Sequence, residues 1–358
     1  MKIGIVGPTH PYKGGIAQHT TQMAHQLQAA GHEVEIISWK RQYPFFYPGQ
    51  QFVADDKPEM PRFPAVKRVL AWNNPLGWAR WARYMRQFDR VVFVWWVPTI
   101  QGPVYSAMLA AMGKKRPETV LVCHNALQHE PRPGDKQLIR AVFKRVDTVI
   151  VHNPEQAKRL KELFNVGARV VKMPLALPLS ANTKKSTLDQ HLLFFGFVRP
   201  YKGVDVLIRA MAQVPEPIHL TIAGEVWGGT AELDALISEL QLAERVSIED
   251  AYIPSEELAI KINQADAVVL PYRSGTGSWN VEMSHACGTP VIATNIHALA
   301  IHVHEGVDGL LCEPEDPQSL ATAIKRFYEP GVAKSLRAGI PEVSIEQDWQ
   351  AYVKAVAR

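Results

Sequence analysis

The sequence predicts an α/β protein with two Rossmann-like, doubly wound parallel-sheet domains that face a central cleft. Short β-branched or aromatic runs alternate with helical patterns in both halves of the chain, which is typical of a parallel sheet made of βαβ units. A polar stretch without periodicity separates the halves. The length of 358 residues is too great for one ordinary core and fits two domains of roughly 150 to 200 residues each.

Residues 1–177 are expected to form the N-terminal domain. A helix is predicted at about residues 16–30, and it should end at Gly31, because glycine accepts the left-handed conformation that stops a helix. Strands are predicted where apolar runs are bounded by turn residues. They are placed at residues 2–6, 33–38, 89–96, 119–123 and 148–152.

Residues 178–190 are predicted to be a linker, since they are rich in Ser, Thr, Lys and Pro and show no apolar period. The C-terminal domain is predicted at residues 191–340, and a C-terminal helix in residues 341–358. Within the second domain, strands are predicted at residues 192–197, 218–223, 245–249, 267–271 and 290–294, and helices at 204–213, 231–240, 255–264 and 280–287.

Composition excludes several classes of protein. Hydrophobic residues make up 47% and charged residues 21% of the chain, which favours a packed globular protein over a disordered one. The three cysteines, Cys123, Cys287 and Cys312, are too far apart for a CxxC site and give no disulfide framework. The net charge of +4 is modest and no nucleic-acid-binding module is present, so no nucleic-acid partner is expected.

The N-terminal segment MKIGIVGPTHP has too short an apolar run for a signal peptide. No stretch approaches the roughly 20 apolar residues of a membrane-spanning helix. A cytoplasmic location is therefore expected.

The most informative segment is HLLFFGFVRPYKGVDVLIRAM, in which Arg199, Lys202 and Gly203 stand between a predicted strand and a predicted helix. Two cations beside the open N-terminus of a helix suit a polyanion such as a diphosphate. The alternative is a solvated loop before an ordinary helix start.

A second segment, YRSGTGSWNVEMSHACGTPVIAT, carries a glycine-rich loop from Gly275 to Ser278, and Glu282 near the start of the next helix. Both segments follow predicted strands, and open α/β sheets bind ligands at that edge. Together they predict a nucleotide-diphosphate site. The alternative for Glu282 alone is an acid favoured by the helix dipole.

With these motifs the chain resembles the retaining nucleotide-sugar glycosyltransferases of family 4, which have the two-domain GT-B fold. The resemblance spans nearly the whole chain, and it implies that the C-terminal helix crosses back to the N-terminal domain. It includes GPTHPYKGGIAQHT, CHNALQHE and VIVHNPEQAKRL in the first half, and FFGFVRPYKG, PYRSGTGSWNVEMSHACGTPVIAT and HEGVDGLLCEPEDPQSLATAI in the second.

The resemblance implies a glycosyltransferase of the hexosyltransferase type. It would move a sugar from a nucleotide-diphosphate sugar to a hydroxyl of a glycan or lipid-linked acceptor, with retention of anomeric configuration. No metal is expected, because two cationic side chains would supply the positive charge, and no cofactor is expected, because the nucleotide sugar is a co-substrate. Two other functions stay open, a nucleotide-sugar epimerase of the same fold and a non-catalytic sugar-nucleotide binding protein.

By the resemblance, Arg199 and Lys202 stabilise the negative charge that grows on the departing diphosphate. His124, which follows the run TVLVC, matches a family histidine that contacts the donor sugar, and a buried, satisfied histidine is the alternative. Gly14 and Gly15 in the first βα loop are predicted to let the backbone approach the donor, and a tight turn is the alternative.

Glu282 matches the second glutamate of the family motif in which seven residues separate two glutamates. The match implies hydrogen bonds from the ribose hydroxyls to this carboxylate. Ser274 stands where the motif has its first glutamate, which changes how the hydroxyls of the donor sugar are held. The backbone N–H groups of Gly275, Thr276 and Gly277 are candidates for that contact.

His129 and Glu130 are candidates for orienting the acceptor. His124 and His129 are five positions apart, whereas zinc ligands on a helix are spaced by four, so no metal site is expected.

A basic and aromatic tract lies in the first half. It suits a helix at an anionic membrane surface, with Trp72, Trp78, Trp81 and Tyr84 directed toward the lipid. The alternative is that these aromatic side chains pack into the domain core and the cations form a solvated face. The basic residues are Arg62, Lys67, Arg68, Arg80, Arg83, Arg86 and Arg90, against the single acid Asp89.

Overall fold

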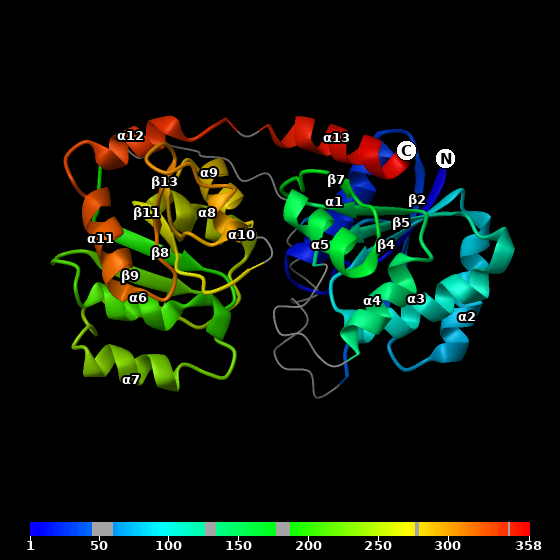
Figure 1. Cartoon of the computed structure of the whole chain (residues 1–358), viewed down its shortest axis with the longest axis horizontal. Helices are drawn as coiled ribbons and strands as arrows, with labels where there is room; N and C mark the ends of the chain where they lie inside the picture. Colours follow the sequence, from blue (N-terminus) through cyan, green and yellow to red (C-terminus); the bar gives the residue numbers. More distant parts are fainter. Residues whose placement is uncertain (45–59, 126–133, 177–186, 276–278, 343) are drawn as a thin grey trace. The chain divides into compact units, whose positions relative to one another are not determined.

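The computed structural model describes residues 1–44, 60–125, 134–176, 187–275, 279–342 and 344–358. The chain forms two units, one of Met1–Leu177 with Ser344–Arg358, and one of Pro178–Val343. Each unit contains one parallel sheet with helices on both faces (Figure 1). This architecture confirms the prediction of two Rossmann-like domains.

The sheet of the first unit is centred on β1 (Lys2–Val6), which pairs with β2 on one side and β4 on the other. Its strand order is β3-β2-β1-β4-β5-β6-β7. The other strands are β2 (Glu33–Arg41), β3 (Val66–Ala71), β4 (Arg90–Trp95), β5 (Glu118–Cys123), β6 (Thr148–Val151) and β7 (Arg169–Val170). All six residues of β4 are buried, as expected for a parallel strand covered on both faces.

The helices cover the two faces of this sheet because the chain runs outward from β1 in both directions. Right-handed crossovers in opposite directions place their helices on opposite faces. Accordingly, α2, α3 and α4 lie together on the face opposite α1 (Figure 1). The bounds are α1 (Gly15–Ala29), α2 (Pro75–Tyr84), α3 (Pro98–Met112), α4 (Asp135–Phe143) and α5 (Pro154–Phe164), with short 3-10 helices at η1 (Met85–Gln87) and η2 (Gly113–Lys115).

Side-chain caps define where several helices begin. Asn74 accepts a hydrogen bond from the backbone of Gly77 before α2, and Asn153 accepts one from Gln156 before α5. In both helices a proline follows the cap, at a position where its missing N–H costs nothing.

The basic tract folds differently from the prediction of one helix. Val66–Ala71 is the edge strand β3, where Lys67 pairs with Glu35 at 2.6 Å, so the helix prediction is wrong for these residues. The aromatic side chains pack against the core of the unit rather than forming an outer face. They are Trp72, Trp78, Trp81 and Tyr84.

The C-terminal helix α13 (Ile345–Ala357) belongs to the first unit, where it packs against α1. Trp349 is buried, stacks on His19 with 5.2 Å between ring centroids, and donates its indole N–H to the carbonyl oxygen of Leu175 at 2.8 Å.

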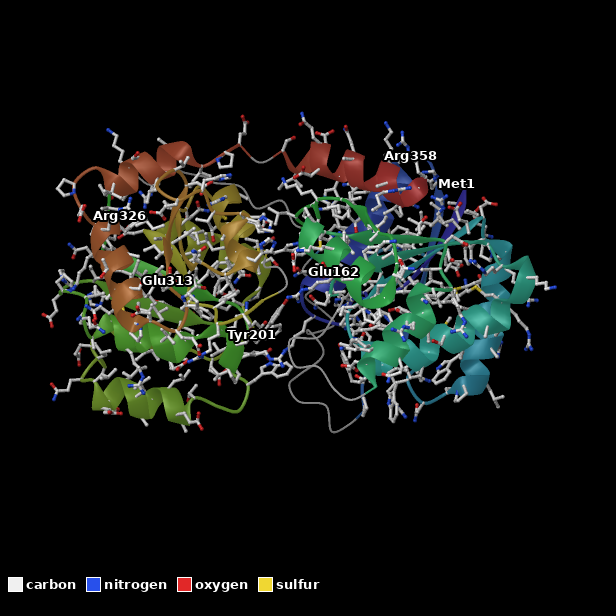
Figure 2. All side chains as sticks on the ribbon, in the orientation of Figure 1. Met1, Glu162, Tyr201, Glu313, Arg326 and Arg358 are labelled. Atoms are coloured by element: carbon white, nitrogen blue, oxygen red, sulfur yellow. The ribbon has the colours of Figure 1, made fainter. Side chains whose placement is uncertain are left out.

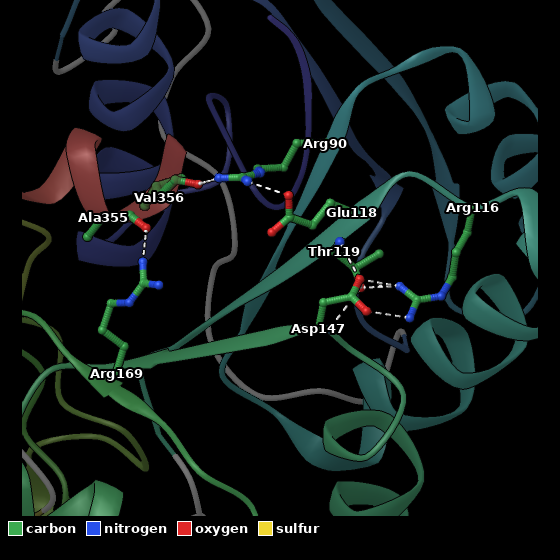
Figure 3. A network of polar contacts seen from close by, with 8 residues as sticks. All are labelled: Arg90, Arg116, Glu118, Thr119, Asp147, Arg169, Ala355 and Val356. Atoms are coloured by element: carbon green, nitrogen blue, oxygen red, sulfur yellow. Dashed lines mark hydrogen bonds and ion pairs between the residues drawn. The ribbon is translucent and has the colours of Figure 1, made fainter. Parts of the chain in front are cut away.

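Two arginines of the sheet bind the end of α13 (Figure 3). Arg90 donates to the carbonyl of Val356 at 2.8 Å, and Arg169 donates to that of Ala355 at 2.7 Å. The last carbonyls of a helix have no partner within the helix, so these arginines stabilise its end. In the same view, Arg116 holds Asp147 through both carboxylate oxygens.

The sheet of the second unit has the order β10-β9-β8-β11-β12-β13. Its strands are β8 (His191–Phe195), β9 (His219–Ala223), β10 (Val246–Glu249), β11 (Ala267–Leu270), β12 (Val291–Thr294) and β13 (Gly309–Cys312). The helices are η3 (Pro200–Lys202), α6 (Val204–Met211), α7 (Ala231–Glu239), α8 (Ser255–Gln264), α9 (Asn280–Ala286), α10 (His297–Ala300), α11 (Pro317–Phe327) and α12 (Val332–Gly339).

The order of these strands creates a switch point between β8 and β11. From β8 the chain crosses to β9, whereas from β11 it crosses to β12 on the other side. The chain therefore leaves the neighbouring ends of β8 and β11 in opposite directions. Open α/β sheets bind ligands at such a point. Both predicted motifs follow these two strands.

The predicted strands correspond to those of the structure within a few residues, but β3, β7 and β13 were not predicted. Residues 178–186 of the predicted linker lie outside the described residues. No helix in the described part of the chain combines the length and the apolar character needed to cross a bilayer.

Candidate functional site

The loop after β8 brings Arg199 and Lys202 to the switch point. Gly203 ends the short helix η3 with φ of +66°. A Cβ atom at this position would lie 2.0 Å from the carbonyl oxygen of Pro271. Only glycine therefore lets the loop after β8 approach the loop after β11 so closely.

Lys202 is buried, with 9% of its surface exposed. Its Nζ donates to the hydroxyl of Tyr272 at 2.5 Å and lies 3.8 Å from the centroid of that ring. Burial, and then the nearby charge of Arg199, lower the pKa of Lys202 to about 7. The ammonium is held by a phenol and its π-face rather than by a carboxylate.

Arg199 lies beside Lys202 and over an aromatic surface. Its Cζ is 4.3 Å from the ring centroid of Trp227, in the loop after β9, and 5.7 Å from that of Tyr201. Tyr201, which lies in the loop after β8, is labelled in Figure 2. Neither Arg199 nor Lys202 forms an ion pair with a described residue. Two neighbouring cations without a described counter-ion favour an anionic ligand.

Arg273 joins the loop after β11 to the loop after β8. Its guanidinium pairs with Asp205 at 2.6 Å and with Glu315 at 3.1 Å, and also donates to the carbonyl of Pro200 at 2.6 Å. Its backbone N–H donates to the carbonyl of Tyr201 at 2.8 Å. This residue was not predicted as part of the site.

Glu282 lies in the first turn of α9, as predicted. Its Oε1 is 2.8 Å from Nδ1 of His302. Its Oε2 is buried and has no hydrogen-bond partner among the described residues. A buried carboxylate oxygen without a partner is costly, so it is suited to accept a hydrogen bond from a ligand.

The start of α9 is tied to β8, because the side-chain amide of Asn280 donates to the carbonyl of Phe195 at 2.9 Å. Ser274 and Gly275 precede α9 in the described part of the chain, and a Cβ at Gly275 would lie 3.2 Å from that of Ala298. Thr276 and Gly277 lie outside the described residues.

Gly14 and Gly15 are at the N-terminus of α1 in the first unit. Gly14 is the N-cap with φ of 96° and ψ of 164°, a conformation that favours glycine, and Gly15 is the first helical residue. Their predicted approach to a donor stays a prediction.

His124 follows β5, and its ring lies inside the first unit. It is 5.1 Å from the rings of both His19 and His152, and its Nε2 is buried without a described partner. Burial, followed by the charges of His152 and His19, holds the pKa of His124 well below its usual range. The histidine is therefore neutral, and its contact with a donor sugar stays a prediction.

His129 and Glu130 lie outside the described residues. Within the described ranges, no group of three or more His, Cys, Asp or Glu side chains is arranged to hold a metal ion.

Four residues of this site were missed by the sequence analysis. Trp227, Tyr272 and Arg273 each follow a strand, so the end-of-strand rule that selected Arg199 could also have found them. His302 carries no such signal, because it precedes β13 and meets Glu282 only through folding.

Two family models match the chain. One, described as Glycosyltransferase Family 4, matches residues 13–177, and the other, described as Glycosyl transferases group 1, matches residues 189–330. The chain belongs to the family 4 glycosyltransferases. The two matches correspond to the two units, and the second contains Arg199, Lys202 and Glu282.

Curated relatives of this family 4 glycosyltransferase include two D-inositol 3-phosphate glycosyltransferases. That of Streptosporangium roseum is 29% identical over 248 residues, which is 63% of this chain and 56% of the relative. That of Acidothermus cellulolyticus is 24% identical over 378 residues, which is 96% of this chain and 84% of the relative. The match to the first thus spans little more than half of that relative.

Solved structures of low sequence identity share the fold over the whole chain. Sucrose-phosphate synthase from Thermosynechococcus elongatus has a TM-score of 0.75 at 20% identity, covering 100% of this chain and 96% of that one. HepE from Anabaena, in complex with UDP, has a TM-score of 0.75 at 16% identity and covers 100% of both chains. The GT-B fold is thereby confirmed.

Proposed function

We propose that this family 4 glycosyltransferase transfers a sugar from a nucleotide-diphosphate sugar to a hydroxyl of a glycan or lipid-linked acceptor. The observation that carries the proposal is the pair Arg199 and Lys202, two adjacent cations at the switch point without a described counter-ion. The solved complexes of Anabaena HepE with UDP and with UDP-glucose, which share the fold, support such a donor.

The two cations suit the chemistry of sugar transfer. When the anomeric C–O bond breaks, negative charge grows on the departing diphosphate, and preorganised cations lower the barrier most where water is excluded. The stacking of Arg199 on Trp227 and the bond of Lys202 to Tyr272 hold both cations in place before the donor binds. Since the protein supplies these charges, we infer a reaction that does not need a metal ion.

Glu282 is assigned to the ribose of the donor. His302 occupies one of its carboxylate oxygens, and the partnerless Oε2 accepts from a ribose hydroxyl. Ser274, Gly275, Thr276 and Gly277 form the segment assigned to the donor sugar.

Retention of configuration is inferred from the resemblance to retaining enzymes. The acceptor hydroxyl attacks the face from which the diphosphate leaves, and the leaving phosphate takes the proton of that hydroxyl. In this assignment His124, Gly14 and Gly15 contribute to donor binding, and His129 and Glu130 orient the acceptor.

A peripheral contact with an anionic membrane surface is assigned to α2. Leu76 is 86% exposed, and Arg80 and Arg83 are exposed on the same helical face. Co-sedimentation with anionic vesicles at low salt tests this contact. Arg80→Gln with Arg83→Gln should abolish it, and binding unchanged in that variant would contradict it.

The transferase activity is tested with labelled nucleotide sugars, with and without candidate acceptors. Label should enter a product only when an acceptor is present, with its anomeric configuration retained. Rearrangement of the donor alone would instead favour an epimerase. Tight UDP binding without transfer to any of a broad acceptor panel would favour a non-catalytic binding protein.

A further inference from the structure

Arg273 makes more polar contacts than either cation assigned to the donor. Its Nη1 donates to the carbonyl of Pro200 at 2.6 Å and to Oδ1 of Asp205 at 2.9 Å. Its Nη2 donates to Oδ2 of Asp205 at 2.6 Å, and its Nε donates to Glu315 at 3.1 Å. One side chain thus connects the loop after β8, the first turn of α6 and the segment after β13.

These contacts fix the backbone that carries the donor-binding cations. Pro200 and Tyr201, whose carbonyls both accept from Arg273, lie between Arg199 and Lys202 in the sequence. A planar guanidinium with several donors at set angles holds a loop in one conformation better than a single ammonium does.

The same contacts also neutralise two carboxylates close to the site. Nη1 of Arg273 binds both the carbonyl of Pro200 and Asp205, so this carboxylate lies close to the donor loop. Burial acts to raise the pKa of Asp205, but the hydrogen bonds and charge of Arg273 outweigh it and lower that pKa. Asp205 is therefore ionised and would repel a diphosphate if it were not paired.

We propose that Arg273 is a positioning residue of the donor site, which holds the Arg199–Lys202 loop in place and keeps Asp205 and Glu315 from opposing the binding of the donor diphosphate. This inference rests on the proposed function. It assigns Arg273 an electrostatic task in addition to a structural one, and the two tasks can be separated by experiment.

The test is calorimetric titration of UDP into the full-length protein and its variants. Arg273→Gln should weaken UDP binding by about tenfold or more, because it releases the loop and leaves a carboxylate unpaired beside the ligand. Arg273→Lys should restore part of the affinity, since it keeps the charge but loses the fork of donors. Arg273→Gln combined with Asp205→Asn should bind UDP more tightly than Arg273→Gln alone.

Arg326→Gln is the matched control. Arg326 pairs with Glu305 at 2.5 Å on the surface of the same unit, and it lies on α11 apart from Tyr201 (Figure 2). This variant should bind UDP as the wild type does. Thermal unfolding of every variant checks that the fold is retained.

Unchanged UDP affinity in Arg273→Gln would overturn the inference. Equal weakening with and without Asp205→Asn would overturn its electrostatic part. Failure of the wild type to bind UDP, GDP or ADP would overturn the proposed function itself. That outcome can be told apart from failure of the inference, in which the wild type binds and Arg273→Gln binds equally well.

Discussion

The ammonium of Lys202 and the hydroxyl of Tyr272 are 2.5 Å apart, and they join the loops that follow two adjacent strands, β8 and β11. The bond crosses the switch point of the second sheet, so a cation from one loop is positioned by a phenol from the other. The donor site assigned above depends on this contact between loops.

Tyr272→Phe should weaken binding of a nucleotide sugar. The phenylalanine keeps the ring but removes the acceptor of a buried ammonium, and a hydrogen bond to a charged group is worth about 1.5–3 kcal/mol. Titration calorimetry measures the loss. Tyr105→Phe is the control, because Tyr105 donates to the carbonyl of Val94 at 2.8 Å in the core of the first unit. This variant should bind the nucleotide sugar with the affinity of the wild type.

Donor affinity should depend on pH through Lys202. Its pKa is about 7 in the free protein, and a bound diphosphate stabilises the charged form. Below pH 7 the amine is already charged, whereas above it each binding event takes up a proton, so affinity falls as pH rises. Calorimetry in buffers of different ionisation enthalpy measures this uptake.

UDP-glucose suits that experiment because its diphosphate does not titrate near pH 7. Lys202→Met, which cannot take up the proton, is the comparison. Equal proton uptake by the wild type and Lys202→Met would show that another group titrates.

Gly203→Ala should disrupt the donor loop. The added Cβ would lie 2.0 Å from the carbonyl oxygen of Pro271, and alanine also disfavours the positive φ. Gly331→Ala is the matched control, since Gly331 has φ of +84° and no atom within 4 Å of the added Cβ. The control should lose about 1 kcal/mol of unfolding free energy, and Gly203→Ala clearly more. Equal losses in urea unfolding would contradict the close approach of the loops.

The first unit should lose stability in acid because of its buried histidines. Burial holds the pKa of His19 and His124 well below the usual value and lowers that of His152 to about 4. The unfolded chain binds protons below its ordinary histidine pKa of about 6.5, whereas the folded one does not, so this stability is present above pH 6.5 and is lost as pH falls. For His152 the loss approaches about 3 kcal/mol near pH 4.

Urea unfolding at several pH values measures this effect. His152→Gln should lose less stability between pH 6.5 and pH 5 than the wild type does. The same pH dependence in both proteins would contradict the assignment.

The sequence predicted most of the fold because its apolar runs are long and regular. The edge strand β3 was missed because Lys67 and Arg68 lie within it, and a strand with charged side chains gives a weak apolar signal. The aromatic residues around α2 matched both a membrane-facing and a core-facing pattern. The structure shows that they pack against the core. Packing of this kind depends on neighbours from distant parts of the chain, which a local sequence pattern does not reveal.

The candidate site was predicted only in part. Arg199, Lys202 and Glu282 follow local patterns at strand ends and helix starts, so sequence could find them. Arg273 also follows a strand, but its pairing with Asp205, 68 positions away, arises only because β8 and β11 are neighbours. No local pattern encodes such a pairing.

Binding of a nucleoside diphosphate to Arg199→Ala and Lys202→Ala tests the central assignment most directly. The wild type should bind UDP, or else GDP or ADP, with an affinity that falls as salt increases, because charged contacts are screened. Each variant should unfold at the temperature of the wild type or close to it, but bind at least about tenfold more weakly and with a smaller salt dependence. Wild-type affinity and salt dependence in both folded variants would contradict the claim that these two cations hold the diphosphate.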